Sequence, residues 1–240
     1  MRLAILSDIH GNIEAFKEVL RDVTAQNVQG CYFLGDAISY GPEPDRVLRL
    51  LQRLNIPCVL GNHELALIHS YARNYFNFTT RHHFAQAEKL ISLKSKKFIS
   101  TWPAWRKEQG MILVHGCPPD SATRYLFELD QEQLFRVFSA MDFPVAFVGH
   151  THELEIIEQF DHGIMHKKLT QGIHLVQGDK ALINVGSVGQ PRDGDNRAKY
   201  IIWEPEKKSI EVCFVDYDIL KSAAGILNRG FSKIYAQRLW

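Results

Sequence analysis

Short apolar runs that end at polar turns dominate the first 150 residues of the chain. The runs lie at 3–6, 31–34, 58–60, 111–114 and 145–148. Residues 13–20 and 47–54 carry apolar side chains at helical spacing, and Asn12 stands where it can cap the first of these helices. Buried strands that alternate with helices are typical of βαβ units in a parallel sheet.

The pattern changes after residue 150, where short apolar runs are separated by Gly and Asp turns. It predicts an antiparallel portion with strands at 154–157, 173–176, 181–185, 200–203 and 210–215, and then a closing helix from about 218 to 227. Residues 65–108 are rich in aromatic residues, helical in pattern and without a clear strand, so we expect an insertion or cap there. The absence of an internal repeat or linker predicts that residues 1–240 form a single domain.

Composition changes this picture little. The chain is 45% hydrophobic and 23% charged with a formal net charge of +1, so neither a basic surface for long nucleic acid nor an acidic tail is indicated. The four cysteines form no C-x-x-C pair, which fits reduced thiols. No apolar stretch approaches the ~20 residues that a membrane span needs, and the N-terminal apolar run lacks a cleavage site. We therefore expect a cytoplasmic protein without a membrane partner, and its oligomeric state is left open.

Polar side chains at the ends of the predicted strands carry the candidate chemistry. Asp8 and His10 are separated by one residue, as are His150 and His152, so on extended backbone each pair points to one side. Because parallel strands end at one edge of a sheet, these groups should meet those that follow the other strands. The full set combines carboxylate, amide and imidazole groups, which suits Mn, Fe, Co, Ni or Zn, and comprises Asp8, His10, Asp36, Asn62, His115, His150 and His152.

Seven candidate ligands are more than one ion normally takes from a protein, so we expect two divalent ions, with manganese as the first choice. A bridging carboxylate would hold them ~3.5–4 Å apart, the separation used for in-line displacement at phosphorus. The ions would bind two phosphate oxygens and convert a bridging water to hydroxide near neutral pH. Each residue alone could be an ordinary polar turn residue, but their combined order along the chain favours the metal site.

The order of these motifs resembles the calcineurin-like metallophosphoesterase superfamily over nearly the whole chain. SDIHGN, GDAISYGPEP, GNHE, HGCP, GHTH and NVGSVGQPRDGD together resemble its small bacterial and archaeal branch. The resemblance implies a four-layer α/β/β/α sandwich. It also implies that Asp36 bridges two metal ions, the first bound by Asp8, His10, Asp36 and His152 and the second by Asp36, Asn62, His115 and His150.

The same resemblance places His63 beside the metals as a donor to the leaving oxygen or to phosphate, a catalytic role worth ~10²–10⁴-fold in rate. In the protein phosphatases of this superfamily, an Asp and then an Arg follow the bridging Asp at the third and fourth positions. This chain has Ser39 and Tyr40 there, so a His–Asp dyad is not expected. The exchange also disfavours the protein phosphatases and the classical symmetrical diadenosine tetraphosphatases.

Arg192, in the glycine-rich segment 186–194, is the candidate for a replacement phosphate clamp, because a guanidinium can hold two phosphate oxygens. Its alternative is a surface salt bridge to Asp193 or Asp195. We also expect Asn62 to contact substrate. Cys117, two residues after His115, is either a small buried residue or an oxidation-sensitive thiol.

Other residues have mainly structural interpretations. His83 and its neighbour His82 would face the cleft only if residues 65–108 cap it. The aromatic residues of that segment are interpreted as core, with base stacking as a lesser alternative: Phe76, Phe78, Phe84, Trp102 and Trp105.

We therefore expect a phosphoesterase that depends on two metal ions, and we favour a phosphodiesterase that acts on small-molecule or nucleotide phosphates. One alternative is a phosphomonoesterase or a dinucleoside-polyphosphate hydrolase. Another is a metal-bound scaffold without catalysis, which the presence of His63 disfavours because a scaffold needs no donor for a leaving group.

Overall fold

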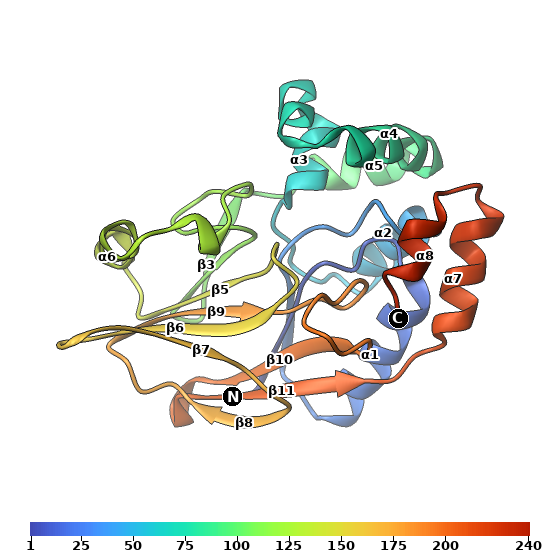
Figure 1. Cartoon of the computed structure of the whole chain (residues 1–240). Helices are drawn as coiled ribbons and strands as arrows, with labels where there is room; N and C mark the ends of the chain where they lie inside the picture. Colours follow the sequence, from blue (N-terminus) through green and yellow to red (C-terminus); the bar gives the residue numbers. More distant parts are fainter.

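Two mixed β-sheets pack face to face in the computed structural model, which describes residues 1–240 (Figure 1). The first sheet has the order β2 (Gly30–Phe33), β1 (Leu3–Leu6), β10 (Ala198–Glu204), β11 (Ser209–Val215) and β8 (Gly172–Leu175). The second has the order β3 (Trp105–Glu108), β4 (Met111–Val114), β5 (Val145–Val148), β9 (Lys180–Val185), β6 (Leu154–Phe160) and β7 (Gly163–Lys168). The parallel pairs are β1 with β2, and β5 with both β4 and β9.

Alternate side chains of β1 enter two different cores. Leu3 and Ile5 pack between the sheets, whereas Ala4 and Leu6 face the helices on the outer side. On that side α1 (Ile13–Ala25) and α2 (Pro44–Arg53) cover the first sheet, and α6 (Gln131–Ala140) covers the second sheet from the opposite side. These four layers confirm the predicted α/β/β/α sandwich.

The predicted beginning of α1 is confirmed in detail, because the Asn12 side chain accepts a hydrogen bond from the backbone N–H of Ala15 at 3.2 Å. The predicted closing helix is also present as α7 (Ile219–Asn228), and it is followed by a short helix, α8 (Lys233–Gln237), that the pattern did not indicate.

The structure differs from the strand predictions at four places. Residues 58–60 form only a single bridge, from Cys58 to Phe33. Residues 105–108 form the edge strand β3, although residues 65–108 were expected to contain no strand; their charged side chains concealed it. The same masking applies to β7, whose side chains are mostly exposed and polar. β9 lies in the portion expected to be antiparallel, yet it pairs with β5 in parallel and only with β6 in the antiparallel sense.

A helical segment lies together at one end of the molecule in Figure 1, above the sheets. It consists of α3 (Asn62–Ile68), a 3-10 turn at Ser70–Tyr75, α4 (Phe78–Ala87), a second turn at Glu88–Leu90 and α5 (Leu93–Ile99). α7 and α8 pack against each other nearby.

One aromatic cluster ties these helices to the loop that follows β2. The backbone N–H of Tyr40 donates to Nε2 of His83 on α4 at 2.8 Å. The ring of Tyr235 on α8 lies 5.2 Å from that of Tyr40 and 4.3 Å from that of His83. Phe231 closes the cluster against His83, with ring centroids 4.5 Å apart. His83 thus holds the loop that begins at Asp36.

The buried position of His83 predicts a pH dependence of stability. Burial lowers the pKa of His83 to about 4 from 6.5, so protons bind more tightly to the unfolded chain. The free energy of unfolding should therefore be unaffected by His83 above pH 6.5 and fall as the pH drops from 6.5 towards 4. His83→Gln should reduce this loss by up to ~3 kcal/mol in urea denaturation between pH 7 and 4.5.

His82→Gln is the matched control, because the neighbouring His82 is exposed on the same helix. It should keep the pH dependence of the wild-type protein. Equal pH dependence in all three proteins would contradict the role assigned to His83.

Candidate metal centre

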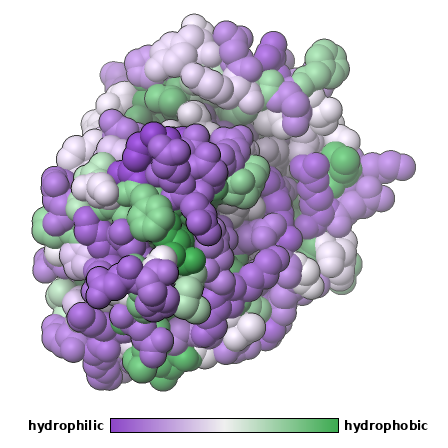
Figure 2. Space-filling model, turned by 60° about the vertical axis from the view of Figure 1, so that its left-hand side comes forward, coloured by the Kyte–Doolittle hydropathy of each residue, from purple (hydrophilic) through white to green (hydrophobic).

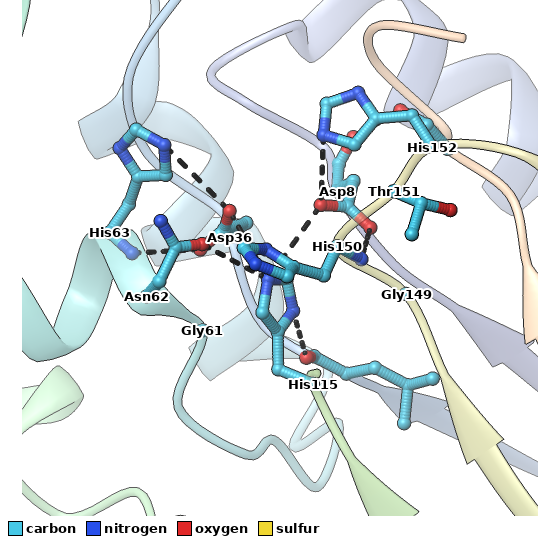
Figure 3. Close-up of polar contacts among 12 residues, drawn as sticks. Asp8, Asp36, Gly61, Asn62, His63, His115, Gly149, His150, Thr151 and His152 are labelled. Carbon is cyan, nitrogen blue, oxygen red and sulfur yellow. Dashed lines mark hydrogen bonds and ion pairs between the residues drawn. The ribbon is translucent and has the colours of Figure 1, made fainter. Parts of the chain in front are cut away.

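The seven predicted donors converge at the edge of the sheets where β1, β2, β4 and β5 end. All of them except His10 are labelled in Figure 3. Asp8 and His10 follow β1, Asp36 follows β2, and Asn62 begins α3. The remaining donors follow β4 and β5. Every member of the set is buried: Asp8, His10, Asp36, Asn62, His115, His150 and His152.

One group of donors is formed by Asp8, His10 and His152, with Asp36 beside it. Asp8 Oδ1 lies 3.6 Å from His10 Nε2 and 3.2 Å from His152 Nε2, and the two ring nitrogens are 3.1 Å apart. Asp36 Oδ2 lies 3.7 Å from His10 Nε2. The ligand atoms of Asp8, His10 and His152 lie within 4.8 Å of one another, close enough to bind one metal ion together.

The second group lies on the other side of Asp36. Its Oδ2 atom is 3.3 Å from His115 Nε2, which lies 3.2 Å from Asn62 Oδ1. A ligand atom of His150 lies within 4.8 Å of both Asp36 and His115. Asp36 therefore faces both groups, as the predicted bridging position requires.

Backbone carbonyls fix the orientation of the imidazoles. Each ring uses one nitrogen to donate to a carbonyl oxygen, so the other nitrogen of a neutral ring presents a lone pair to the centre. The donors are Nδ1 of His10 to Ile38 at 2.9 Å, Nδ1 of His115 to Leu34 at 2.8 Å, Nδ1 of His152 to Gln190 at 2.6 Å, and Nε2 of His150 to Thr123 at 3.2 Å.

This arrangement fits a bound cation and leaves the lone pairs unfavourably placed without one. The Nε2 atoms of His10 and His152 face each other at 3.1 Å, although both rings already donate through Nδ1. Asp8 Oδ1 is buried beside them with no hydrogen-bond partner. Buried acceptors that converge in this way need a positive charge between them.

The charges of the ionisable groups agree with this interpretation. Against the effect of burial, the neighbouring histidines hold the pKa of Asp8 well below its usual range. Burial lowers the pKa of His150 to about 3 and that of His152 to about 4. For His115 burial is outweighed by Asp36 and Asp8, which raise its pKa to about 9. A metal ion at this position therefore has to displace a proton from His115.

Several donors have strained backbone conformations. φ is positive at Asp8 (54°), His10 (48°), Asp36 (61°), His150 (70°) and His152 (64°). Non-glycine residues rarely adopt this region, and each instance costs of order 1–3 kcal/mol. The remainder of the fold must hold these turns in place, which is typical of a functional site.

Two glycines of the sequence motifs are required because backbone passes directly against the carboxylates. A Cβ at Gly61 would lie 2.1 Å from Asp36 Oδ1. A Cβ at Gly149 would lie 2.0 Å from Ser7 Oγ and 2.5 Å from Asp8 Oδ2. The close approach allows the backbone N–H groups of His63 and His150 to donate to Asp36 at 2.9 Å and to Asp8 at 3.0 Å.

Glu64 supports the site in a way that the sequence reasoning did not identify. Its buried carboxylate accepts the backbone N–H groups of Asp36 at 2.7 Å, Ala37 at 2.9 Å, Ile38 at 3.3 Å and Gly61 at 3.1 Å. It therefore shapes the turn that carries Asp36. Its position, three residues after a glycine at the beginning of a helix, was the available signal.

A cavity of about 800 Å³ opens beside the donors and is lined by His63, Asn62 and Arg192 among others. His63 is buried, its Nδ1 atom has no hydrogen-bond partner, and it makes no hydrogen bond to Ser39, as predicted from the missing second Asp. The pKa of His63 is held well below 6.5 by burial, so the free imidazole is neutral at pH 7.

Arg192 lines this cavity, and the surface salt bridge considered as its alternative is wrong. Its guanidinium donates to Gln190 Oε1 at 3.3 Å and forms no ion pair. The two aspartates near it have other partners: Asp193 pairs with Lys199 at 2.7 Å, and Asp195 pairs with Arg197 at 2.6 Å.

Of the aromatic residues interpreted as core, Phe76, Phe84 and Trp102 are buried. The interpretation was wrong for Phe78, which is 86% exposed and lines the cavity, and for Trp105, which is 38% exposed on β3.

Cys117 is a buried free thiol whose pKa burial raises to about 11, which favours the inert alternative. The face shown in Figure 2 is largely hydrophilic, with hydrophobic residues in small groups. None of the helices is both long and apolar enough to cross a membrane.

Comparison with known proteins gives this geometry a family. A model of the calcineurin-like phosphoesterase superfamily domain matches residues 1–208. The chain is 32% identical to an uncharacterized protein of Methanocaldococcus jannaschii, over 99% of this chain and 97% of that protein. The crystal structure of a metallophosphoesterase from Sphaerobacter thermophilus is 31% identical and superposes with a TM-score of 0.86, covering 100% of this chain and 98% of that one.

A symmetrical bis(5'-nucleosyl)-tetraphosphatase of Wigglesworthia glossinidia brevipalpis is 41% identical over 114 residues, which is 46% of this chain and 39% of that enzyme. The family model and the two full-length similarities agree with the fold and with the converging donors. The chain belongs to the calcineurin-like phosphoesterase superfamily and is a metal-dependent hydrolase of phosphate esters.

Proposed function

We propose that this protein is a phosphodiesterase that acts on small-molecule or nucleotide phosphates and uses two divalent ions, manganese being the first candidate. The observation that carries this proposal is the position of Asp36 between the two donor groups, where its Oδ2 atom lies 3.7 Å from His10 Nε2 and 3.3 Å from His115 Nε2 beside one cavity. A shared carboxylate is the arrangement that two-metal phosphoesterases need.

In this proposal one ion takes Asp8, His10, Asp36 and His152, and the other takes Asp36, Asn62, His115 and His150. Bound there, the ions would supply Lewis acidity and a water of lowered pKa. The protein's own contribution is to fix the seven donors through carbonyls, backbone N–H groups and strained turns, so that little rearrangement is needed on binding.

Three residues of the cavity wall act on the substrate in this proposal. Arg192 has a guanidinium free of ion pairs and binds two phosphate oxygens. The side chain of Asn62 lies where it can contact substrate as well as metal. His63 donates a ring N–H to the leaving oxygen; because burial keeps it neutral, it acts as a hydrogen-bond donor without the support of a carboxylate dyad.

A dinucleoside-polyphosphate hydrolase is the second candidate, favoured by the partial match to a symmetrical bis(5'-nucleosyl)-tetraphosphatase. Tyr40 counts against the classical form of that enzyme, because the ring packs 4.5 Å from His10 at the position where an arginine was expected. A phosphomonoesterase and a non-catalytic scaffold complete the alternatives.

One panel of assays separates these functions. Chelator-treated protein is reloaded with Mn²⁺, Ni²⁺, Co²⁺, Zn²⁺ or Mg²⁺ and assayed on a phosphodiester, a phosphomonoester and a dinucleoside tetraphosphate. We expect the phosphodiester to be hydrolysed with the highest kcat/KM, and Mn²⁺ to restore the most activity. Activity confined to the monoester would overturn the diesterase proposal, and no activity with any ion would favour the scaffold.

Asp36→Asn should weaken metal binding at both positions, because an amide oxygen lacks the charge needed to bridge two cations. Metal content of the purified variant, measured by elemental analysis, should fall for both ions, and kcat/KM should fall at least ~10³-fold. Asp142→Asn, at an exposed residue that does not line the cavity, is the control. A variant with two bound ions and full activity would disprove the bridging assignment.

His63→Ala should retain its metal ions and lose turnover by ~10²–10³-fold, the usual contribution of one hydrogen-bond donor to a developing negative charge on oxygen. The loss of kcat should be larger for a methyl ester, which has to expel methoxide, than for a 4-nitrophenyl ester, whose 4-nitrophenolate leaves without assistance. The exposed His69, seven residues after Asn62, gives the matched control His69→Ala. An equal loss of kcat for both esters would show that His63 does not assist the leaving oxygen.

A further inference from the structure

A basic groove lies among α1, α2 and α5 and shares no lining residue with the cavity beside the metal donors. Five of its eight lining residues are cations and none is a carboxylate. The cations are Lys17, Arg46, Arg49, Arg53 and Lys94. In a chain whose formal net charge is only +1, this is a local concentration of positive charge that the composition does not indicate.

Three helices bring these cations together. Arg46, Arg49 and Arg53 lie on one face of α2, because residues three and four positions apart are neighbours on a helix surface, and they span ~10.5 Å along its axis. α2 contacts both α1, which contributes Lys17, and α5, which contributes Lys94. In Figure 1, α2 accordingly lies between α1 and the helical segment above the sheets. The groove therefore takes its charge from three elements that the fold brings side by side.

Two of the five cations have a carboxylate neighbour whose closer partner lies elsewhere. Glu14 is 3.7 Å from Lys17 but 3.1 Å from Lys221 on α7. The same holds for Glu43, which is 3.9 Å from the first groove arginine of α2 but 2.8 Å from Arg229. Cations outside the groove thus neutralise these two carboxylates, and the positive charge inside the groove is left largely without a partner.

The other three cations are equally available to a ligand. Arg49 pairs with Asp45 at 3.3 Å, and that carboxylate also accepts hydrogen bonds from two serine hydroxyls of the α5 region at 2.8 and 2.6 Å. Arg53 and Lys94 are exposed and form neither an ion pair nor a hydrogen bond. Exposed ion pairs within a helix are weak, so an anion can also compete for the paired arginine.

The remaining lining residues decide which kind of anion fits the groove. They are Ile13, Leu50 and Gln52, so no aromatic ring lines it. Proteins that bind single-stranded nucleic acid stack the bases on aromatic side chains, and protein–protein interfaces are built around aromatic anchors. The groove has neither feature. Its volume of about 610 Å³ lies in the range of small-molecule sites, and guanidinium groups match phosphate oxygens in pairs.

We propose that this groove is a binding site for a small molecule that carries three or more phosphate groups. The guanidiniums of Arg46, Arg49 and Arg53 hold phosphate oxygens in succession along α2, and the ammonium groups of Lys17 and Lys94 bind the remaining ones. The ligand is bound and not hydrolysed, because no carboxylate or imidazole lines the groove to bind a metal ion or activate water. The site is independent of the proposed phosphodiesterase function.

The probe is inorganic tripolyphosphate, and its binding to the metal-loaded protein is measured by titration calorimetry in about 0.15 M salt, where exposed charges more than ~8 Å apart are largely screened. Affinity should rise from orthophosphate through pyrophosphate to tripolyphosphate, because each added phosphate meets a further cation. Combining Arg53→Ala with Lys94→Ala should weaken tripolyphosphate binding at least ~10-fold. Both side chains are exposed and unpaired, so the midpoint of urea denaturation should stay at the wild-type value.

The metal cavity also attracts phosphate, so its contribution is measured separately. Tripolyphosphate bound there competes with bis(4-nitrophenyl) phosphate, and its inhibition constant should be equal in the wild-type protein and in the double variant, whose changes lie outside the cavity. The matched control combines Arg136→Ala with Lys208→Ala, which removes the same two charges at exposed positions outside both the groove and the cavity. The control should bind tripolyphosphate as tightly as the wild-type protein does.

Equal affinity for tripolyphosphate in the wild-type protein and in the groove variant would overturn the proposal. Equal weakening in both double variants would overturn it as well, since net charge alone would then explain the effect. Tighter binding of a single-stranded oligonucleotide than of tripolyphosphate, lost in the groove variant, would show a nucleic-acid surface instead of a small-molecule site. The calorimetric comparison does not depend on hydrolysis of the diester, so it decides the proposal even if the proposed phosphodiesterase function fails.

Discussion

Mutual repulsion among buried acceptors is the constraint on which the rest of this structure depends. Ring nitrogens of four histidines, two carboxylates and an amide oxygen point at one buried edge of the sheets, and the unprotonated Nε2 atoms of His10 and His152 are 3.1 Å apart. Such an arrangement is unfavourable on its own and becomes favourable only with cations inside it. Metal binding at this edge therefore affects both the stability of the fold and the chemistry of the site.

Several local contacts in the surrounding fold hold the donors in place against this repulsion. Glu64 gathers four N–H groups under Asp36, the carbonyls of Ile38, Leu34 and Gln190 fix three rings, and two glycines let backbone pass against the carboxylates. The cluster around His83 adds support from the helices. Rigid support of this kind is what holds five donors in left-handed backbone conformations.

Local signals in the sequence predicted most strand ends and the convergence of the seven polar side chains, whereas the four layers followed from the family resemblance. An apolar run followed by a polar turn marks a strand end, and strand ends of parallel strands meet. The sequence could not predict β3 and β7, whose charged edge residues hide their periodicity, or the parallel pairing of β9, which depends on tertiary contacts. The roles of Glu64 and His83 in holding the loop after β2 were not predicted, because their hydrogen-bond partners in that loop lie more than 20 residues away in the sequence.

The position of β1 in the first sheet also has a consequence for how the molecule is made. β1 carries Asp8 and His10 at its end, yet it pairs with β10, which is formed by residues 198–204. Asp8 and His10 are synthesised early, but their strand β1 can pair with a neighbour on both sides only after nearly 200 further residues have been synthesised. Contacts of such long range slow folding. In the nascent chain the donors are therefore not yet brought together. We expect the complete metal site to form only late in folding, after β10 has paired with β1.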